Sequence, residues 1–193
     1  VERLGAREHH GIGAFQVLHG VADTLAQMMG LAREVADGFM KEHPDRTIFV
    51  AGSVGPTNKT ASMSPDVSDP AYRAVTYLDL YSAYKEQVDA LVDGGVDIVL
   101  FETTFDTLNV KAGLEAAEAV LKEKGKDLPI MLSMTLSAQG GRTFSGQTLL
   151  AFLASVQHTN IVSVGLNCSF GAADMKPFLA ELAKHAPYYI SAY

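Results

Sequence analysis

From residue 47 onward, the sequence alternates short apolar runs with longer segments of helical periodicity, and this alternation constrains the fold most. Five runs are rich in Val, Ile, Leu, Phe and Met with little polar alternation, which is typical of parallel strands buried on both faces. They cover residues 47–53, 97–103, 128–135, 161–168 and 188–192. Apolar residues at helical spacing predict helices at about residues 77–92, 108–124, 147–158 and 174–185.

This alternating order requires right-handed parallel crossovers and leaves two architectures, a (β/α) barrel or an open doubly wound sheet. Five strands are fewer than the eight of a complete barrel, and the fifth run lies next to the last residue, Tyr193. We therefore expect an interior piece of a longer α/β protein. The segment before residue 47 is harder to interpret, although residues 15–40 favour a helix.

Composition and charge exclude several classes of protein. Of the 193 residues, 48% are hydrophobic and 19% charged, which indicates a folded domain with a sizeable core. The formal net charge of −7 argues against a nucleic-acid or anionic-membrane surface. The sequence shows no signal peptide and no apolar run of the roughly 20 residues that cross a bilayer. A single cysteine permits no internal disulfide and fits a reducing compartment, so we expect a cytoplasmic protein.

That single cysteine, Cys168, closes the fourth predicted strand. Ligands and catalytic groups in parallel α/β folds gather at the carboxyl ends of strands. A nucleophilic cysteine needs a nearby histidine base, but His158 and His185 both fall near helix C-termini, at the opposite edge of the sheet. A metal role is more plausible, although one cysteine cannot hold zinc alone. The alternative is that Cys168 is a small buried hydrophobic residue.

Polar residues also follow the other strands. Glu102 lies within an apolar strand, where a carboxylate needs a cationic or hydrogen-bonding partner, either a core Lys or Arg or the amino group of a substrate. Asp106 is expected to be the N-cap of the next helix. The long segment at residues 52–70 is either functional or an ordinary surface loop. Glycines and hydroxyls at residues 137–147 give only a weak anion-binding signal, because a turn with a helix cap explains them equally well.

Four motifs closely resemble the homocysteine-binding domain of cobalamin-dependent methionine synthase. They are GPTNKTASMSPDV at residues 55–67, ETTFDTLN at 102–109, GRTFSGQT at 141–148 and GLNC at 165–168. They occur in the order of that family between about residue 31 and Tyr193. The first and third motifs separate the chain from the betaine-dependent relatives, which share mainly the glutamate and the Gly-x-Asn-Cys features.

The resemblance implies a partial (β/α)8 TIM barrel of about five parallel strands, with strands missing at both ends. It implies methyl transfer to homocysteine, forming methionine, by a zinc-activated homocysteine thiolate that attacks methylcobalamin, whose methyl group comes from methyltetrahydrofolate. Cys168 matches the first of three zinc-binding cysteines, Glu102 matches the acid that binds the substrate amino group, and Asn167 is expected in the same substrate-binding pocket. The implied cofactors are zinc and cobalamin. The implied partners are homocysteine and cobalamin- and folate-binding domains of the same polypeptide.

Two departures from the family pattern shape our expectations. Residues 1–30 do not resemble the family, so we expect a helical N-terminal segment followed by a partial homocysteine-binding barrel at residues 31–193. The adjacent Cys-Cys pair that would complete the zinc site does not occur in the sequence. We therefore expect this chain to be a fragment of a methyltransferase and inactive alone. The alternatives are another zinc-thiolate homocysteine S-methyltransferase with a different methyl donor, or a non-catalytic barrel remnant.

Overall fold

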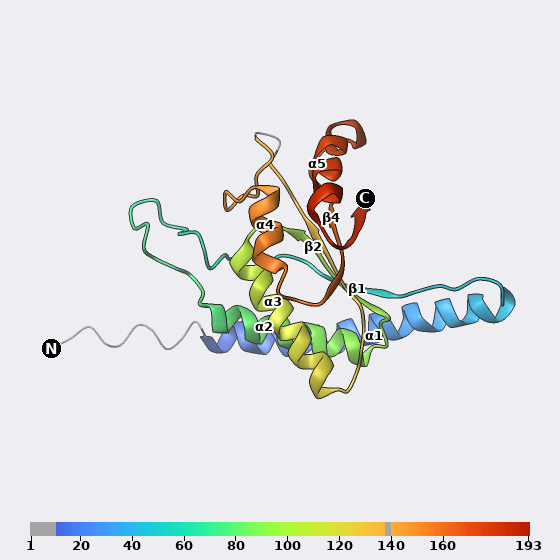
Figure 1. The fold of residues 1–193 in the computed structure, drawn as a ribbon. Coiled ribbons are helices and arrows are strands. Elements are labelled where there is room, and N and C mark those ends of the chain that lie inside the picture. The colour runs from blue at the N-terminus through green and yellow to red at the C-terminus, as the bar shows by residue number, and fades with distance from the viewer. Residues whose placement is uncertain (1–10, 138–139) are drawn as a thin grey trace.

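The structure, a computed structural model, describes residues 11–137 and 140–193. Within these ranges the chain alternates strands and helices around one parallel sheet (Figure 1). The strands are β1 (Ala51–Val54), β2 (Ile98–Thr104), β3 (Ile130–Met134), β4 (Ile161–Leu166) and β5 (Tyr189–Ala192). The helices are α1 (Gly11–Glu42), α2 (Tyr77–Asp93), α3 (Thr107–Glu123), α4 (Leu149–Val156) and α5 (Ala172–His185).

The five strands lie in chain order, β1-β2-β3-β4-β5, and each pairs in parallel with the next. Consecutive helices also pack beside one another in chain order. A doubly wound sheet would change direction at a switch point and place helices on both faces. Sequential strands with neighbouring helices form instead an arc of a (β/α) barrel, which confirms the predicted partial barrel.

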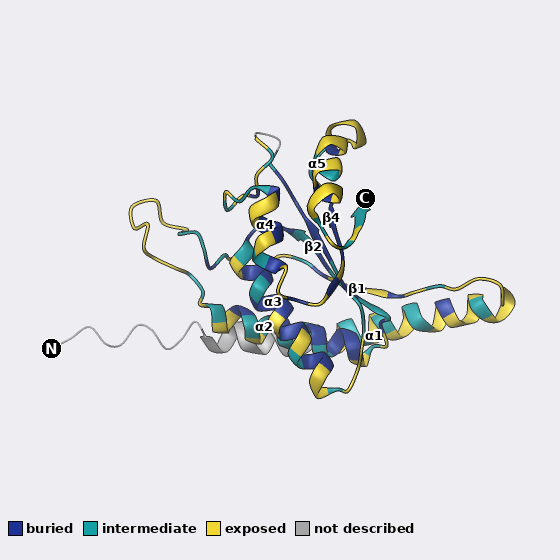
Figure 2. Cartoon of the chain, in the orientation of Figure 1, coloured by how far each residue is buried: buried dark blue, intermediate teal, exposed yellow. Residues whose placement is uncertain are grey.

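The hydrophobic core lies between the sheet and the helices, as the buried residues in Figure 2 show. One row of paired residues crosses four strands and is buried throughout, at Val54, Phe101, Leu132 and Val164. Phe101 packs so close to α3 that a Cβ atom on Gly113 would lie 2.6 Å from its ring. Because side chains alternate along a strand, the residues that follow this row point to the inner face of the arc.

Helix caps explain several element boundaries. The predicted cap Asp106 accepts hydrogen bonds from the backbone N–H groups of Leu108 and Asn109 and begins α3. Thr76 begins α2 with a capping box closed by Asp79.

Four of the five predicted strands are longer than the observed ones, and the cause is clear for β1 and β4. β1 begins at Ala51 rather than residue 47, because the N–H of Val50 donates to the side chain of Asp97 instead of joining the ladder. β4 ends at Leu166, so Asn167 and Cys168 follow the strand rather than close it. At Cys168 the backbone is left-handed (φ 54°), two residues past the end of the strand.

The amino-terminal helix is longer than predicted and spans residue 30, the expected domain boundary. Its Arg33 forms an ion pair with Asp97, with 2.5 Å between Nη1 and Oδ2, and so joins α1 to the start of β2. Residues 1–10 of the predicted N-terminal segment lie outside the described residues. No helix in the described ranges is long and apolar enough to cross a membrane.

Candidate functional site

The carboxyl ends of the strands bring polar side chains together on the inner face of the arc, and we call this edge the polar rim. Glu102 comes from β2, Ser133 from β3 and Asn167 from the residue after β4. Ser53 comes from the edge strand β1, and Tyr193 directly follows the other edge strand, β5. Barrel interiors are normally filled with bulky branched side chains. Here the row of paired residues at this level is Ser133, Gly165 and Ser191, which leaves the inner face small and polar.

The Glu102 carboxylate is held by two hydroxyl groups. The Ser53 hydroxyl donates to Oε1, and the Tyr193 hydroxyl donates to Oε2 over 2.8 Å. Within the described part of the chain, no Lys or Arg forms an ion pair with Glu102. The sequence left two cationic partners open, a core Lys or Arg and the amino group of a substrate. The described residues provide no core cation, so the amino group of a substrate is the alternative that stays open.

Asn167 is 1% exposed and uses its whole amide within the protein. Its Oδ1 accepts hydrogen bonds from the backbone N–H of Thr103 (3.0 Å) and the hydroxyl of Ser133 (2.7 Å). Its Nδ2 donates to the Thr103 hydroxyl (2.8 Å) and to Sγ of Cys168 (3.3 Å). An amide has two donors and one oxygen acceptor with two lone pairs, so this pattern uses its full capacity. The structure thus places Asn167 under the site as a brace between β2, β3 and Cys168.

Thr103 and Cys168 face each other across the end of the sheet, and both have left-handed backbone conformations, with φ of 56° and 54°. Their Oγ1 and Sγ atoms are 4.0 Å apart. A β-branched residue such as threonine rarely adopts this conformation, which costs about 1–3 kcal/mol and is typical of functional sites. Cys168 is exposed, so the alternative of a small buried hydrophobic residue is wrong.

The Tyr193 hydroxyl also interacts electrostatically with both Glu102 and Cys168. Partial burial raises the pKa of the Tyr193 hydroxyl above its ordinary range, and the hydrogen bond to Glu102 and the charges of Glu102 and Cys168 raise this pKa further. The hydroxyl therefore keeps its proton at neutral pH and stays a donor to the carboxylate.

The described residues alone do not form a complete metal site. No group of three His, Cys, Asp or Glu side chains in residues 11–137 and 140–193 is arranged to hold a metal ion. His185 ends α5 and His158 follows α4, so both lie at the edge of the sheet away from Cys168. The exposed Cys168 sulfur, steadied by the Asn167 N–H, fits one ligand position of a thiolate metal site.

The other polar loops have structural partners. Asn109 of α3 holds the long loop by accepting from the N–H of Ala61 (2.9 Å) and donating to Thr57 Oγ1 (3.1 Å) and the carbonyl of Lys59 (2.9 Å). In the glycine-rich loop, the Ser145 hydroxyl donates to the carbonyl of Phe105 (2.8 Å). Turn and cap contacts, as in the alternative considered from the sequence, therefore account for the described residues of this segment.

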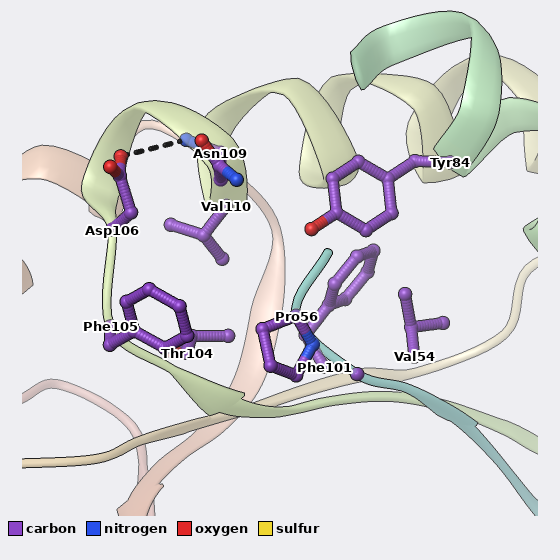
Figure 3. A pocket seen from close by; sticks show the side chains of 10 residues that line it. Val54, Pro56, Tyr84, Phe101, Thr104, Phe105, Asp106, Asn109 and Val110 are labelled. Carbon is purple, nitrogen blue, oxygen red and sulfur yellow. Dashed lines mark hydrogen bonds between the residues drawn. The ribbon is translucent and has the colours of Figure 1, made fainter. Parts of the chain in front are cut away.

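A small cavity lies on the helix side of the sheet, beneath the start of the long loop (Figure 3). Phe101 and Tyr84 line it, together with the N-terminal turn of α3. Its volume is about 10 Å³, which is room for at most one water molecule. Glu102 points to the opposite face, so this cavity is separate from the polar rim.

Sequence reasoning missed Ser53, Thr103, Ser133 and Tyr193 as parts of this site. Ser53 and Ser133 do lie near the ends of predicted strands, which is the signal that could have identified them. The left-handed conformation of Thr103 has no sequence signal, because threonine disfavours it. The contact between Tyr193 and Glu102 depends on the curvature of the sheet.

Comparisons with known proteins agree with this arrangement. The sequence model of the homocysteine S-methyltransferase family matches residues 6–193. The apo form of the homocysteine methyltransferase MmuM from Escherichia coli is similar in structure, with 21% identity and a TM-score of 0.72 over 91% of this chain and 61% of that chain. Its metallated form gives 22% identity and a TM-score of 0.70 over 88% of this chain and 56% of that chain. The chain therefore spans less than two thirds of these structures, whose likeness shows the shared barrel fold. On the extent of the family match, the chain belongs to the homocysteine S-methyltransferase family.

Proposed function

We propose that this chain forms part of the site at which homocysteine is methylated to methionine. In this proposal, Glu102 binds the substrate ammonium group and Cys168 is one ligand of a zinc ion that holds the substrate sulfur. The observation that carries it is the single polar rim in which the Glu102 carboxylate, Tyr193 and the exposed Cys168 sulfur lie together. A carboxylate and a soft metal ligand at one rim match a substrate that carries both an ammonium group and a thiol.

Zinc, when bound, would lower the pKa of the substrate thiol and keep it as a nucleophilic thiolate. The chain's own residues would orient this substrate. Glu102 would fix the amino end by a charge-assisted hydrogen bond. Asn167 would keep Cys168 in place through its N–H to the sulfur and its two hydrogen bonds to Thr103. In the transfer, the substrate sulfur forms a bond to the methyl carbon, and the bond from that carbon to the donor breaks and leaves its electron pair on the donor.

We propose methylcobalamin as the donor, recharged from methyltetrahydrofolate on domains of the same polypeptide. The support is the likeness of residues 55–67 and 141–148 to the cobalamin-dependent family. The zinc ligands other than Cys168 would come from outside the described residues. MmuM, whose structure is similar, also exists in a metallated form, and this supports a metal role for Cys168.

The test is a methyl-transfer assay on the protein produced from its complete gene. We expect methionine to form from homocysteine and methylcobalamin, and to fail to form from betaine or a sulfonium donor. Methionine from a sulfonium donor alone would support the alternative of a different donor. Absence of methionine with every donor, in folded and zinc-supplied protein, would support the non-catalytic alternative.

A further inference from the structure

The two hydroxyl groups on Glu102 come from opposite edges of the sheet. Ser53 lies on β1, next to the strand of Glu102, whereas Tyr193 follows β5, at the far edge. The arc is curved enough for Tyr193 to reach across two intervening strands and donate to Oε2 over 2.8 Å. Each oxygen of the carboxylate thus accepts a hydrogen bond from a different part of the barrel.

These two hydrogen bonds fix the orientation of the Glu102 carboxylate before a ligand binds. A glutamate side chain has several rotatable bonds, so an unheld carboxylate loses conformational entropy whenever it binds a partner. A carboxylate accepts up to about four hydrogen bonds, so one hydroxyl on each oxygen leaves room for an ammonium donor.

We propose that Ser53 and Tyr193 are positioning residues for Glu102. They hold its carboxylate ready for the ammonium group of an amino-acid thiol, and thereby make the enzyme prefer such a substrate over a thiol that lacks the amino group. This inference rests on the proposed function and adds to it the origin of substrate selectivity.

The test compares two substrates, homocysteine and 4-mercaptobutyrate, which has the same carbon chain, thiol and carboxylate but no amino group. Kinetics are measured for the protein from the complete gene and for Tyr193→Phe, Ser53→Ala and the conservative Ser53→Thr. Tyr189→Phe is the matched control, because Tyr189 lies on β5, is 83% exposed and has no polar contact with Glu102 in the described structure.

We expect KM for homocysteine to rise about tenfold in Tyr193→Phe and in Ser53→Ala, the loss of one hydrogen bond to a charged group. KM for 4-mercaptobutyrate should stay unchanged, since this substrate does not use Glu102. Ser53→Thr, which keeps the hydroxyl, and Tyr189→Phe should both behave as the wild type.

Two results would overturn the inference while leaving the proposed function intact. One is an equal rise of KM for both substrates, which indicates a general structural defect. The other is an unchanged KM for homocysteine in both variants. A wild-type protein that methylates neither thiol would overturn the proposed function itself, and this inference with it.

Discussion

Asn167 holds Thr103 by two hydrogen bonds, accepting from its backbone N–H at Oδ1 over 3.0 Å and donating from Nδ2 to its hydroxyl over 2.8 Å. The same amide also donates to the Cys168 sulfur. Thr103 and Cys168 both have left-handed backbones. Strain of this kind persists only where surrounding contacts hold it, and Asn167 supplies those contacts on both sides of the rim.

We expect Asn167→Ala to lower the free energy of unfolding by about 2–4 kcal/mol, because it leaves the Thr103 N–H and the Ser133 hydroxyl without their partner. Urea denaturation measures this loss. The control Asn160→Ala, at an exposed position, should change stability by no more than about 0.5 kcal/mol. Equal stabilities for the two variants would show that Asn167 does not brace the rim.

Glu102→Gln tests recognition of the amino group. The substitution keeps the shape but removes the charge, so we expect KM for homocysteine to rise about tenfold or more while kcat changes little. Steady-state kinetics on the protein from the complete gene give both values. Glu181→Gln, at an exposed position on α5, is the matched control. A normal KM in Glu102→Gln would remove Glu102 from the substrate site.

Asn109→Ala tests the anchoring of the long loop. The substitution removes three hydrogen bonds, to Ala61, Thr57 and Lys59, so the loop should open more often. We expect faster cleavage by a protease within residues 55–76. Asn58→Ala, at an exposed loop position, serves as the control. If both variants are cleaved at the wild-type rate, contacts other than Asn109 hold the loop.

The raised pKa of Tyr77 predicts that the protein loses stability in alkali. Burial, followed by a 2.5 Å hydrogen bond to Glu115, raises its pKa from 10.0 to about 12. Between these two values the unfolded chain has released the proton and the folded chain has kept it, so stability falls as the pH rises from 10 to about 12. Denaturation across this range should show a smaller fall in Tyr77→Phe. An unchanged slope would mean that the phenol is not held in this way.

Much of the fold follows from local patterns in the sequence. Apolar runs identified all five strands to within a few residues, and Asp106 marked the start of α3 because capping is a local interaction. The choice between a barrel and a doubly wound sheet did not follow from these patterns, because it depends on which strands and helices become neighbours. The family resemblance favoured the barrel, and the sequential strand order agrees with it.

The site was only partly predictable for the same reason. Glu102 and Cys168 stand out because a carboxylate and a thiol are unusual beside apolar strands. The role of Asn167 as a brace depends on contacts with residues 34 and 64 positions away in the sequence. Tyr193 reaches Glu102 across 91 residues, a contact set by the curvature of the whole sheet.

Methyl transfer to homocysteine by the protein from the complete gene, with the wild-type chain and with Cys168→Ser, tests the proposed site most directly. Serine has nearly the size of cysteine, so the far-ultraviolet circular dichroism spectrum should not change. We predict that the wild type forms methionine and retains zinc, and that Cys168→Ser does neither. Normal methionine formation by Cys168→Ser would contradict the assignment of this rim as the homocysteine site.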